Sequence, residues 1–412
     1  MPTHESRRLR RAIGGLLLIL PSVARAQERL LGERTLGVGP TAEWVRFGGA
    51  GLALTDAIAG DTLRVRRVTQ VSFPVSAAMT LGGAWRLDVT SLLGSGTATF
   101  TDRAGRERTA SLAGMSDVRA RATGRLFSDA VLLTIGVNAP TGRTSLDGTQ
   151  YGALRVLAAP ALGLGSSPVG AGPSGVLGMV VARQAAAWTV AAGASYEHRG
   201  RFQPVAALMA GAPSIDFRPG GVMRASLSAD RLIGRHRLHL ATAADVFAAD
   251  RLRDGRAPAG AIADLAAVRL GPVLATDAQV EWATPRLREL VTYASYRWRA
   301  PFARDGITVT GSDAQYLDGG VRATVPVRPS LDVVLGSDVR WHSGLGVESG
   351  LPGAGVTSAL VLAGLRVRAR RLSWQPFVRA QGGRLRLRDA GRTTASEAIT
   401  GVTGGMIAVV RF

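Results

Sequence analysis

The chain of 412 residues combines a hydrophobic content of 46% with a mean hydropathy of only +0.14 and a formal net charge of +20. Its fifty basic residues are all arginine, and they alternate with apolar residues instead of clustering, which argues against a nucleic-acid partner. Cysteine is absent from the sequence, which excludes disulfides, thiolate metal sites and cysteine nucleophiles.

The first 26 residues have the three parts of an export signal. A basic start at residues 7–11 is followed by an uncharged run from Ala12 to Leu20 and by a small-residue motif that ends at Ala26. This run is too short for a membrane-spanning helix, which needs about 20 apolar residues. We expect cleavage between Ala26 and Gln27, with an uncleaved amphipathic segment as the alternative.

From residue 61 onward, apolar and polar residues alternate with a period of two, which is typical of β-strands with two different faces. In residues 331–341, leucine, valine and tryptophan share one face, whereas Asp332, Asp338 and Arg340 share the other. A soluble sandwich would bury the apolar face, and a membrane barrel would turn it toward lipid. The segments run to roughly 10–14 residues, longer than usual sandwich strands. Together with the export signal, this length favours a barrel.

The connections between these segments alternate in length. Short links are expected at residues 125–129, 184–187, 232–235, 327–330 and 370–372, and long ones at residues 94–114, 139–173, 199–219, 248–258, 300–312 and 342–354. Short periplasmic turns that alternate with long external loops are typical of outer-membrane barrels. We therefore predict an all-β fold, an antiparallel transmembrane β-barrel in the cell outer membrane.

The predicted number of strands is about fourteen, within a range of roughly twelve to sixteen. We expect an even number, as in other barrels of this type. Residues 44–54, part of an N-terminal segment of residues 27–60, could form a first strand or a plug. Residues 272–298 could form one strand or two around Pro285, and we expect one. The predicted organisation is thus a signal peptide (1–26), this N-terminal segment (27–60) and the barrel (61–412).

The last residues predict a strand that ends on an aromatic side chain. Phe412, Val410 and Ala408 share one face of this strand with further apolar residues. A terminal phenylalanine in this position resembles the sorting signal read by the outer-membrane assembly machinery, which we expect as a partner. Several of the seven tryptophans fall near predicted strand ends, where indole rings form girdles at the headgroup level.

Charged residues on the face opposite the apolar ones are predicted to line the lumen. They could form a structural charge network or a polar path with an anion-preferring constriction. The candidates are Arg119, Arg121, Arg125, Arg366, Arg368, Arg384, Arg386, Arg388, Asp117, Asp332 and Asp338.

Residues suited to catalysis are few. His236 and His239 are three positions apart, so on a strand they would point to opposite faces and share no metal. His342 and Ser343 resemble the histidine–serine pair of outer-membrane lipid A esterases, but no other acyl-transfer motif accompanies them. We expect no enzyme activity, no metal and no cofactor, and keep a lipid-modifying hydrolase as the less favoured alternative.

Two neighbouring segments resemble a known barrel family. Residues 117–122 are DVRARA, and residues 132–143 are LLTIGVNAPTGR. The pattern is similar to a strand with D-x-R followed by a strand ending in G-x-N-x-P-T-G-[KR], found in the family named for the MetA pathway of phenol degradation, which is related in shape to fatty-acid channels. The resemblance covers about thirty residues and implies transport of small hydrophobic or aromatic compounds.

The function predicted from these observations is an outer-membrane channel or transporter for small, hydrophobic or aromatic, compounds. The alternative is a structural or surface-interaction barrel whose long loops bind something outside the cell. The expected partners are outer-membrane lipids, the assembly machinery and a small-molecule solute, and the expected state is a monomer.

Overall fold

The computed structural model describes residues 34–49, 52–55, 62–81, 85–102, 104–126, 130–158, 162, 164, 169–205, 215–254, 264–344, 355–389 and 392–412. The predicted signal peptide and its cleavage site at Ala26 and Gln27 lie outside these residues. No helix in these ranges is both long enough and apolar enough to span a membrane.

Nearly all of the described chain is strand. The large sheet contains β1 (Thr35–Val38), β2 (Thr41–Phe47), β3 (Leu52–Thr55), β4 (Thr62–Leu81), β5 (Trp85–Thr101), β6 (Glu107–Met115), β7 (Val118–Leu126), β8 (Val131–Ala139), β9 (Ser174–Ala185), β10 (Trp188–Arg199), β13 (Val222–Ile233), β14 (His236–Phe247), β17 (Val273–Trp282), β18 (Glu289–Arg299), β21 (Ala314–Arg328), β22 (Leu331–Ser343), β23 (Gly355–Ala369), β24 (Leu372–Asp389) and β25 (Arg392–Arg411). A small sheet contains β11 (Phe202–Val205), β12 (Ile215–Arg218), β15 (Asp250–Asp254), β16 (Asp264–Arg269), β19 (Ala303–Arg304) and β20 (Ile307–Thr308). One helix, α2, spans Gly148–Leu157.

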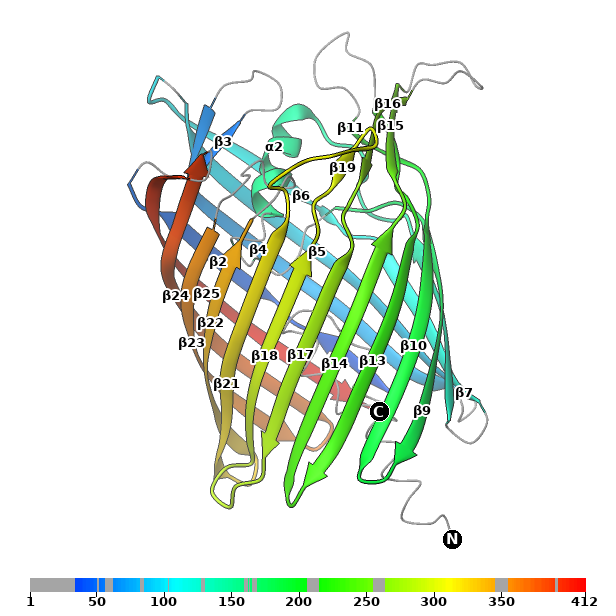
Figure 1. Cartoon of the computed structure of the whole chain (residues 1–412). Helices are drawn as coiled ribbons and strands as arrows, with labels where there is room; N and C mark the ends of the chain where they lie inside the picture. Colours follow the sequence, from blue (N-terminus) through cyan, green and yellow to red (C-terminus); the bar gives the residue numbers. More distant parts are fainter. Residues whose placement is uncertain are drawn as a thin grey trace.

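The large sheet closes on itself as an antiparallel barrel (Figure 1). β1 and β2 pair with β4 on one side and with the C-terminal β25 on the other, so the first and last strands meet. β1, β2 and β3 together make one interrupted strand along β4, and β6 and β7 make another along β5. Counted in this way, the described residues form a barrel of sixteen strands.

The prediction of about fourteen strands is therefore too low. The difference comes from the two segments whose strand number the sequence left undecided, residues 44–54 and 272–298. The N-terminal segment supplies a strand, because Trp44 lies opposite Thr69 on β4 and Val402 on β25. Residues 272–298 form two strands, β17 and β18, which pair with each other along their length. Pro285 lies in the turn between them, where its missing N–H is not needed by a ladder.

The outer face of the barrel is apolar and exposed. Along β22, for example, Leu335, Val339 and Trp341 are all exposed on one face. Such an uninterrupted exposed apolar surface is stable only in lipid, where the closed sheet also leaves no backbone N–H or C=O unpaired. The protein is thus a membrane barrel of the outer-membrane type.

The tryptophans mark the two edges of this apolar surface. By register, all seven side chains lie on the outer face: Trp85, Trp188, Trp282 and Trp374 near the short turns, and Trp44, Trp298 and Trp341 toward the other end. Trp341 and Trp374 are linked through β23, where their partners Thr357 and Val367 are ten positions apart. At ~3.3 Å per residue and a tilt of ~40°, this separation is about 25 Å, the height of the apolar band in such barrels.

The two ends of the barrel differ in their connections. Short turns join β9 to β10, β13 to β14, β21 to β22 and β23 to β24 at one end, as predicted, and C-terminal Phe412 lies at this end (Figure 1). We call it the periplasmic end. At the extracellular end, the predicted long link at residues 94–114 is wrong, because β5 continues to Thr101 and β6 begins at Glu107. The alternation of Thr, Ala and Ser there continues the two strands above the membrane.

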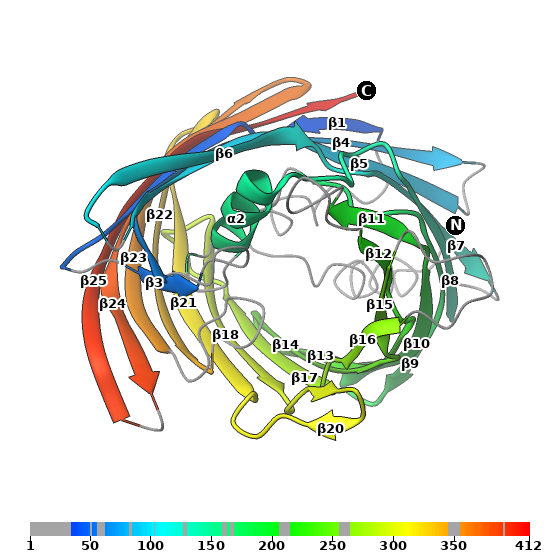
Figure 2. The ribbon, with the colours of Figure 1, turned by 90° about the horizontal axis from the view of Figure 1, so that it is seen from above.

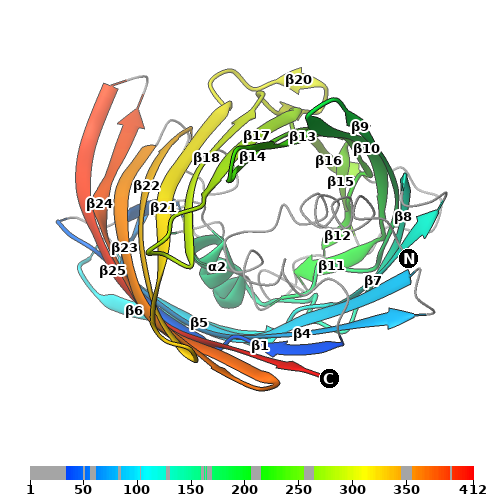
Figure 3. The ribbon, with the colours of Figure 1, turned by 90° about the horizontal axis from the view of Figure 1, so that it is seen from below.

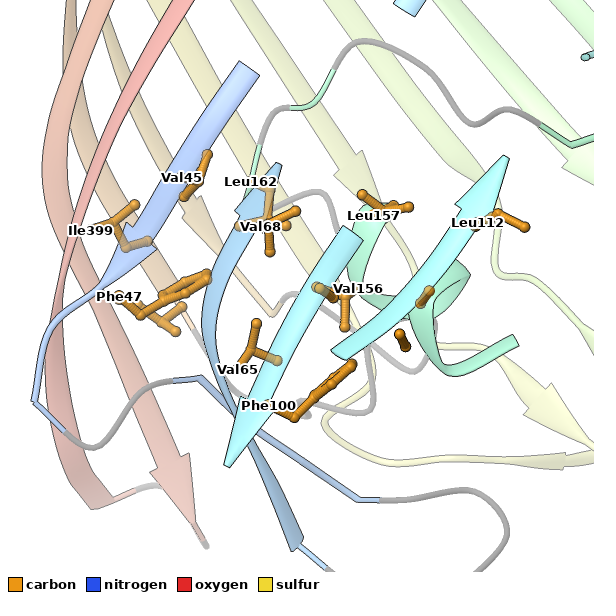
Figure 4. Close-up of a cluster of buried hydrophobic side chains, with 14 of the residues drawn as sticks. Val45, Phe47, Val65, Val68, Phe100, Leu112, Val156, Leu157, Leu162 and Ile399 are labelled. Carbon is orange, nitrogen blue, oxygen red and sulfur yellow. The ribbon is translucent and has the colours of Figure 1, made fainter. Parts of the chain in front are cut away.

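Seen along the barrel axis, helix α2 lies inside the ring of strands (Figures 2 and 3), and the side view places it near the extracellular end (Figure 1). Its N-terminus is capped by Asp147, which accepts the Gln150 N–H at 2.8 Å while the Gln150 side chain accepts the Asp147 N–H at 3.2 Å. We predicted only a loop here, although an Asp-x-x-Gln capping box is a helix-start signal. Val156 and Leu157 pack against Val65 and Phe100 of the wall (Figure 4). These wall residues therefore face inward.

The small sheet continues part of the wall upward. β12 and β15 pair above β13 and β14, and β16 and β19 pair above β17 and β18, so the three long connections after β10, β14 and β18 join in one antiparallel sheet. Phe202 and Phe217 stack edge to face within it at 5.4 Å. Seen from above, β11, β12 and β15 lie over the ring (Figure 2).

Candidate functional site

The inner face of each strand follows from Val65, Val68 and the strand registers. Residues that lie directly opposite each other on paired strands point to the same face. Starting from the inward residues Val65 and Val68, the register therefore identifies the inward residues of each following strand. It places Arg119, Arg121 and Arg125 on the inner face of β7, as predicted.

These arginines lie on a wet part of the inner wall. Arg119 and Arg121 are exposed although they face inward, so solvent reaches them in the lumen. Asp88 on β5 lies directly opposite Arg121, and Glu197 and Arg224 are among the other charges that act on it most strongly. Among the described residues, neither Arg119 nor Arg121 has an ion pair within 4.0 Å. As far as the described residues go, the site therefore presents two guanidinium groups without an ion pair to the lumen.

The wall beside these arginines carries small side chains. Its inward positions on β8, β9, β10 and β13 include Gly136, Gly178, Gly193, Ser195 and Ser226. Such residues fill little of the lumen, which keeps the arginines accessible. The sequence analysis did not identify this part of the wall, because small inward residues weaken the polar–apolar alternation. It also missed Arg224, which forms a bidentate pair with Asp245 at 2.6 and 2.7 Å.

The opposite part of the wall holds a more closed charge network. Asp318 on β21 accepts the Arg340 Nε–H at 3.0 Å and lies 3.2 Å from His342 Nε2. The Tyr293 hydroxyl donates to Asp338, a predicted lumen residue, at 2.5 Å. These residues face the lumen, but they neutralise one another, so this part of the wall is a structural network.

A second network lies at the periplasmic end. Asp332 is fully buried between Arg288 and Arg368, with N–O distances of 2.9 and 2.7 Å. Arg366 pairs with Glu289 at 3.6 Å and donates to Gln375 at 3.1 Å. The predicted inward positions of Asp332, Arg366 and Arg368 are correct, and their partners show that they join β18, β22, β23 and β24.

The predicted lumen positions of Arg384 and Arg386 are wrong. On β24 the inward residue between them is Leu385, which is fully buried in the cluster around α2, so both arginines lie on the outer face and are exposed. The physical reason is that the polarity of the two faces reverses above the membrane, where the outside meets water and the inside holds an apolar cluster. Arg388 follows a bulge on β24, and its side chain lies outside the described residues.

Asp117 is also not a wet lumen residue. It is buried immediately before β7, where its carboxylate accepts the backbone N–H of Gly142 at 2.9 Å and that of Ala171 at 2.7 Å. The Asn138 amide donates to the same carboxylate at 3.0 Å and to the Gly172 carbonyl at 2.6 Å. We call Asp117 with these partners the loop latch, because it joins residues 142, 171 and 172 to β7 and β8.

The four histidines among the described residues lie apart on the wall and are not gathered into one cluster. Neighbouring strand residues point to opposite faces, so His342 faces inward and Ser343 does not join it. His239 faces inward beside Asp230 at 3.4 Å, whereas His236 faces outward against Trp282, as predicted from their spacing. No cluster of metal-ligating residues occurs in the described ranges.

The C-terminal face agrees with its predicted alternation. Phe412 is exposed on the outer side, in line with Val410 and Ala408, and its N–H donates to the Arg34 carbonyl at 3.0 Å. This bond closes the barrel at the periplasmic end. Recognition of Phe412 by the assembly machinery stays a prediction.

Replacing Gly96 by valine is expected to displace α2 from the wall. A Cβ atom at Gly96 would lie 2.7 and 2.8 Å from the two methyl carbons of Leu157, so this side chain, which is packed in the buried cluster, must move, and the further methyl groups of valine extend the overlap. In bilayer recordings of the purified barrel, we expect a larger single-channel conductance. Gly404→Val is the control, because Gly404 faces lipid with no atom within 4 Å. An unchanged conductance in Gly96→Val would show that α2 does not limit passage.

Comparisons with known proteins reveal structural likeness only. No family model matches the chain, and no curated protein matches it. Among solved structures, OprB of Pseudomonas putida is similar over 95% of this chain and 97% of its own, with 12% identity and a TM-score of 0.44. OmpT of Vibrio cholerae, an outer-membrane protein, is similar over 92% and 98%, with 10% identity and a TM-score of 0.38. The translocator domain of the autotransporter NalP from Neisseria meningitidis is similar over 99% and 98%, with 9% identity and a TM-score of 0.32.

Proposed function

We propose that this outer-membrane barrel is a channel for small organic solutes, and that Arg119 and Arg121 contact them in the lumen. The observation that carries the proposal is the combination of inward orientation, exposure to solvent and lack of an ion pair among the described residues. A purely structural arginine would be paired, as Arg340 is with Asp318.

The class of solute is the finer part of the proposal. The resemblance of residues 117–143 to the phenol-degradation barrels supports small hydrophobic or aromatic compounds, and two free guanidinium groups favour those that carry a negative charge. Small aromatic carboxylates combine both properties. The small side chains beside the arginines would leave room for a planar ring.

Replacement of both arginines by glutamine is expected to reduce anion preference. A unit charge ~7 Å from an ion in water contributes about 0.6 kcal/mol, roughly a threefold change in local anion concentration for each arginine. Reversal potentials across planar bilayers at low salt, where screening is weak, should therefore shift toward cations in the Arg119→Gln/Arg121→Gln protein. Benzoate entry into loaded liposomes should slow by a similar factor.

The matched control removes two charges from the outer face. Arg384→Gln/Arg386→Gln has the same net charge as the lumen variant but changes no inward residue. We expect its ion preference and benzoate entry to match those of the unmodified protein. Equal shifts in both variants would overturn the assigned role of the arginines, and a lack of conductance in the unmodified protein would overturn the channel.

The ordered small sheet favours a second candidate function, a surface interaction at the extracellular end. Long loops need not pair, yet three of them form one sheet above the wall. Deletion of residues 202–218 is the test: lost adhesion of cells with unchanged benzoate entry would support the surface role, and unchanged adhesion would contradict it.

A further inference from the structure

The outer face carries an arginine cluster just above the extracellular girdle. We define the rim cluster as Arg46 on β2, Arg67 on β4, and Arg384 and Arg386 on β24. All four side chains are exposed on the outer face. They extend across the seam where the first and last strands of the barrel meet, because β25 lies between β2 and β24.

The height of the rim cluster follows from the register. Trp44, in the extracellular girdle, lies two residues before Arg46 on the same face of β2. Arg46 is opposite Thr400 on β25, and Arg384 is opposite Ala398, one step further from the membrane centre. Two residues of strand rise by ~6.6 Å, less after tilt, so the guanidinium groups begin at the headgroup level.

Two members of the cluster face each other directly. Arg46 and Arg67 are register partners on adjacent strands, which places their Cα atoms about 5 Å apart on one face. Like charges directly opposite each other destabilise a sheet unless an anion lies between them. Among the described residues, no carboxylate lies within 4.0 Å of any of the four arginines. The described part of the chain therefore supplies no anion to this arrangement.

We propose that the rim cluster binds the phosphate groups of an anionic lipid in the outer leaflet. Guanidinium groups bind phosphate oxygens in a bidentate manner, which suits Arg more than any other side chain. The cluster spans four strands, a width of about 14 Å at ~4.8 Å between strands, enough for two phosphates on one headgroup. The apolar face below it, with Trp44 and Val402, provides contact for acyl chains. A bis-phosphorylated glycolipid matches both parts.

The test uses the full mature chain in detergent, with diphosphoryl lipid A as the probe. We expect the Arg46→Gln/Arg67→Gln/Arg384→Gln/Arg386→Gln protein to bind the lipid at least about tenfold more weakly, since hydrogen bonds to charged groups contribute about a factor of ten each. The control, Arg183→Gln/Arg231→Gln, removes two outer-face arginines from the periplasmic end and should bind normally. Equal affinity in all three proteins would overturn the proposal.

Two further measurements distinguish lipid from free phosphate and from a folding defect. Inorganic phosphate at millimolar concentration should not displace lipid A; full displacement would show a simple anion site and contradict the lipid. Arg46→Gln alone should unfold at a higher temperature than the unmodified protein in lipid-free detergent, and at a lower one with lipid A present. If the substitution changed the unfolding temperature in the same direction with and without lipid A, this would contradict an anion between Arg46 and Arg67.

Discussion

Replacing Asp117 by alanine is expected to free from the wall the segment that begins at Pro140 and carries α2, while the barrel stays folded. The loop latch satisfies three donors in partly buried contacts, the N–H groups of Gly142 and Ala171 and the amide of Asn138. A fully buried donor without a partner costs about 1–3 kcal/mol, and these three are partly buried, so the loss of the carboxylate should cost roughly 3 kcal/mol in total.

Trypsin cleavage after Arg143 measures this opening, because Arg143 lies between the latch and α2 and its carbonyl accepts the Gly170 N–H at 2.8 Å. A change of 3 kcal/mol in local stability raises the open population roughly a hundredfold, and the cleavage rate should rise in proportion. Because α2 belongs to the same loop, conductance should rise as well.

Two variants sharpen this test. Asp117→Asn keeps the shape but turns an NH2 group toward an N–H donor, so it should behave like alanine. Asp305→Asn is the control, because Asp305 also accepts a backbone N–H, that of Ala267 at 2.7 Å, but lies exposed in the small sheet. Protease resistance of both Asp117 variants would show that the loop is held mainly by the packing of α2 against the wall.

The sequence pattern predicted the faces of the membrane-spanning strands well, because one physical rule holds throughout the apolar band. Arg119 and Arg121 point inward and Val339 outward, since lipid accepts only apolar side chains. The same rule failed at Arg384 and Arg386, which lie above the band, where water surrounds the wall. Alternation alone does not show where a strand leaves the membrane. The first outer-face charge beyond a tryptophan, such as Arg46 after Trp44, is a usable sign.

The alternation of polar and apolar residues could not predict contacts between residues far apart in the sequence. Asp117 and Gly142 form part of a recognisable motif, but their contact with Ala171 joins residues 54 positions apart, which no local spacing reveals. The strand number failed for a related reason. Pro285 permits either a turn or an interruption, and only the pairing of β17 with β18 decides between them. The capped helix α2, by contrast, had a local signal at Asp147 and Gln150.

Replacing Asp332 by alanine is expected to destabilise the whole barrel, because it removes the one carboxylate between two arginines. Asp332 is fully buried, and Arg288 and Arg368 approach it at 2.9 and 2.7 Å from β18's preceding turn and from β23. Breaking a buried ion pair costs about 3–5 kcal/mol when the remaining charge stays buried. About a third of each arginine side chain is exposed, 37% and 34% respectively, so water would stabilise part of the released charge. We expect about 2–3 kcal/mol.

Asp245→Ala provides the comparison that isolates burial. Its partner Arg224 forms the shorter contact, 2.6 Å, but the arginine side chain is 46% exposed to the lumen. Exposed pairs contribute about 0–1 kcal/mol, so this variant should unfold from vesicles at nearly the same denaturant concentration as the unmodified barrel. Asp332→Ala should unfold at a clearly lower one, with Asp332→Asn between them. If the two alanine variants shifted equally, pair geometry rather than burial would determine the contribution of these ion pairs. In that case the lumen network around Asp318 would stabilise the barrel as much as the buried one does.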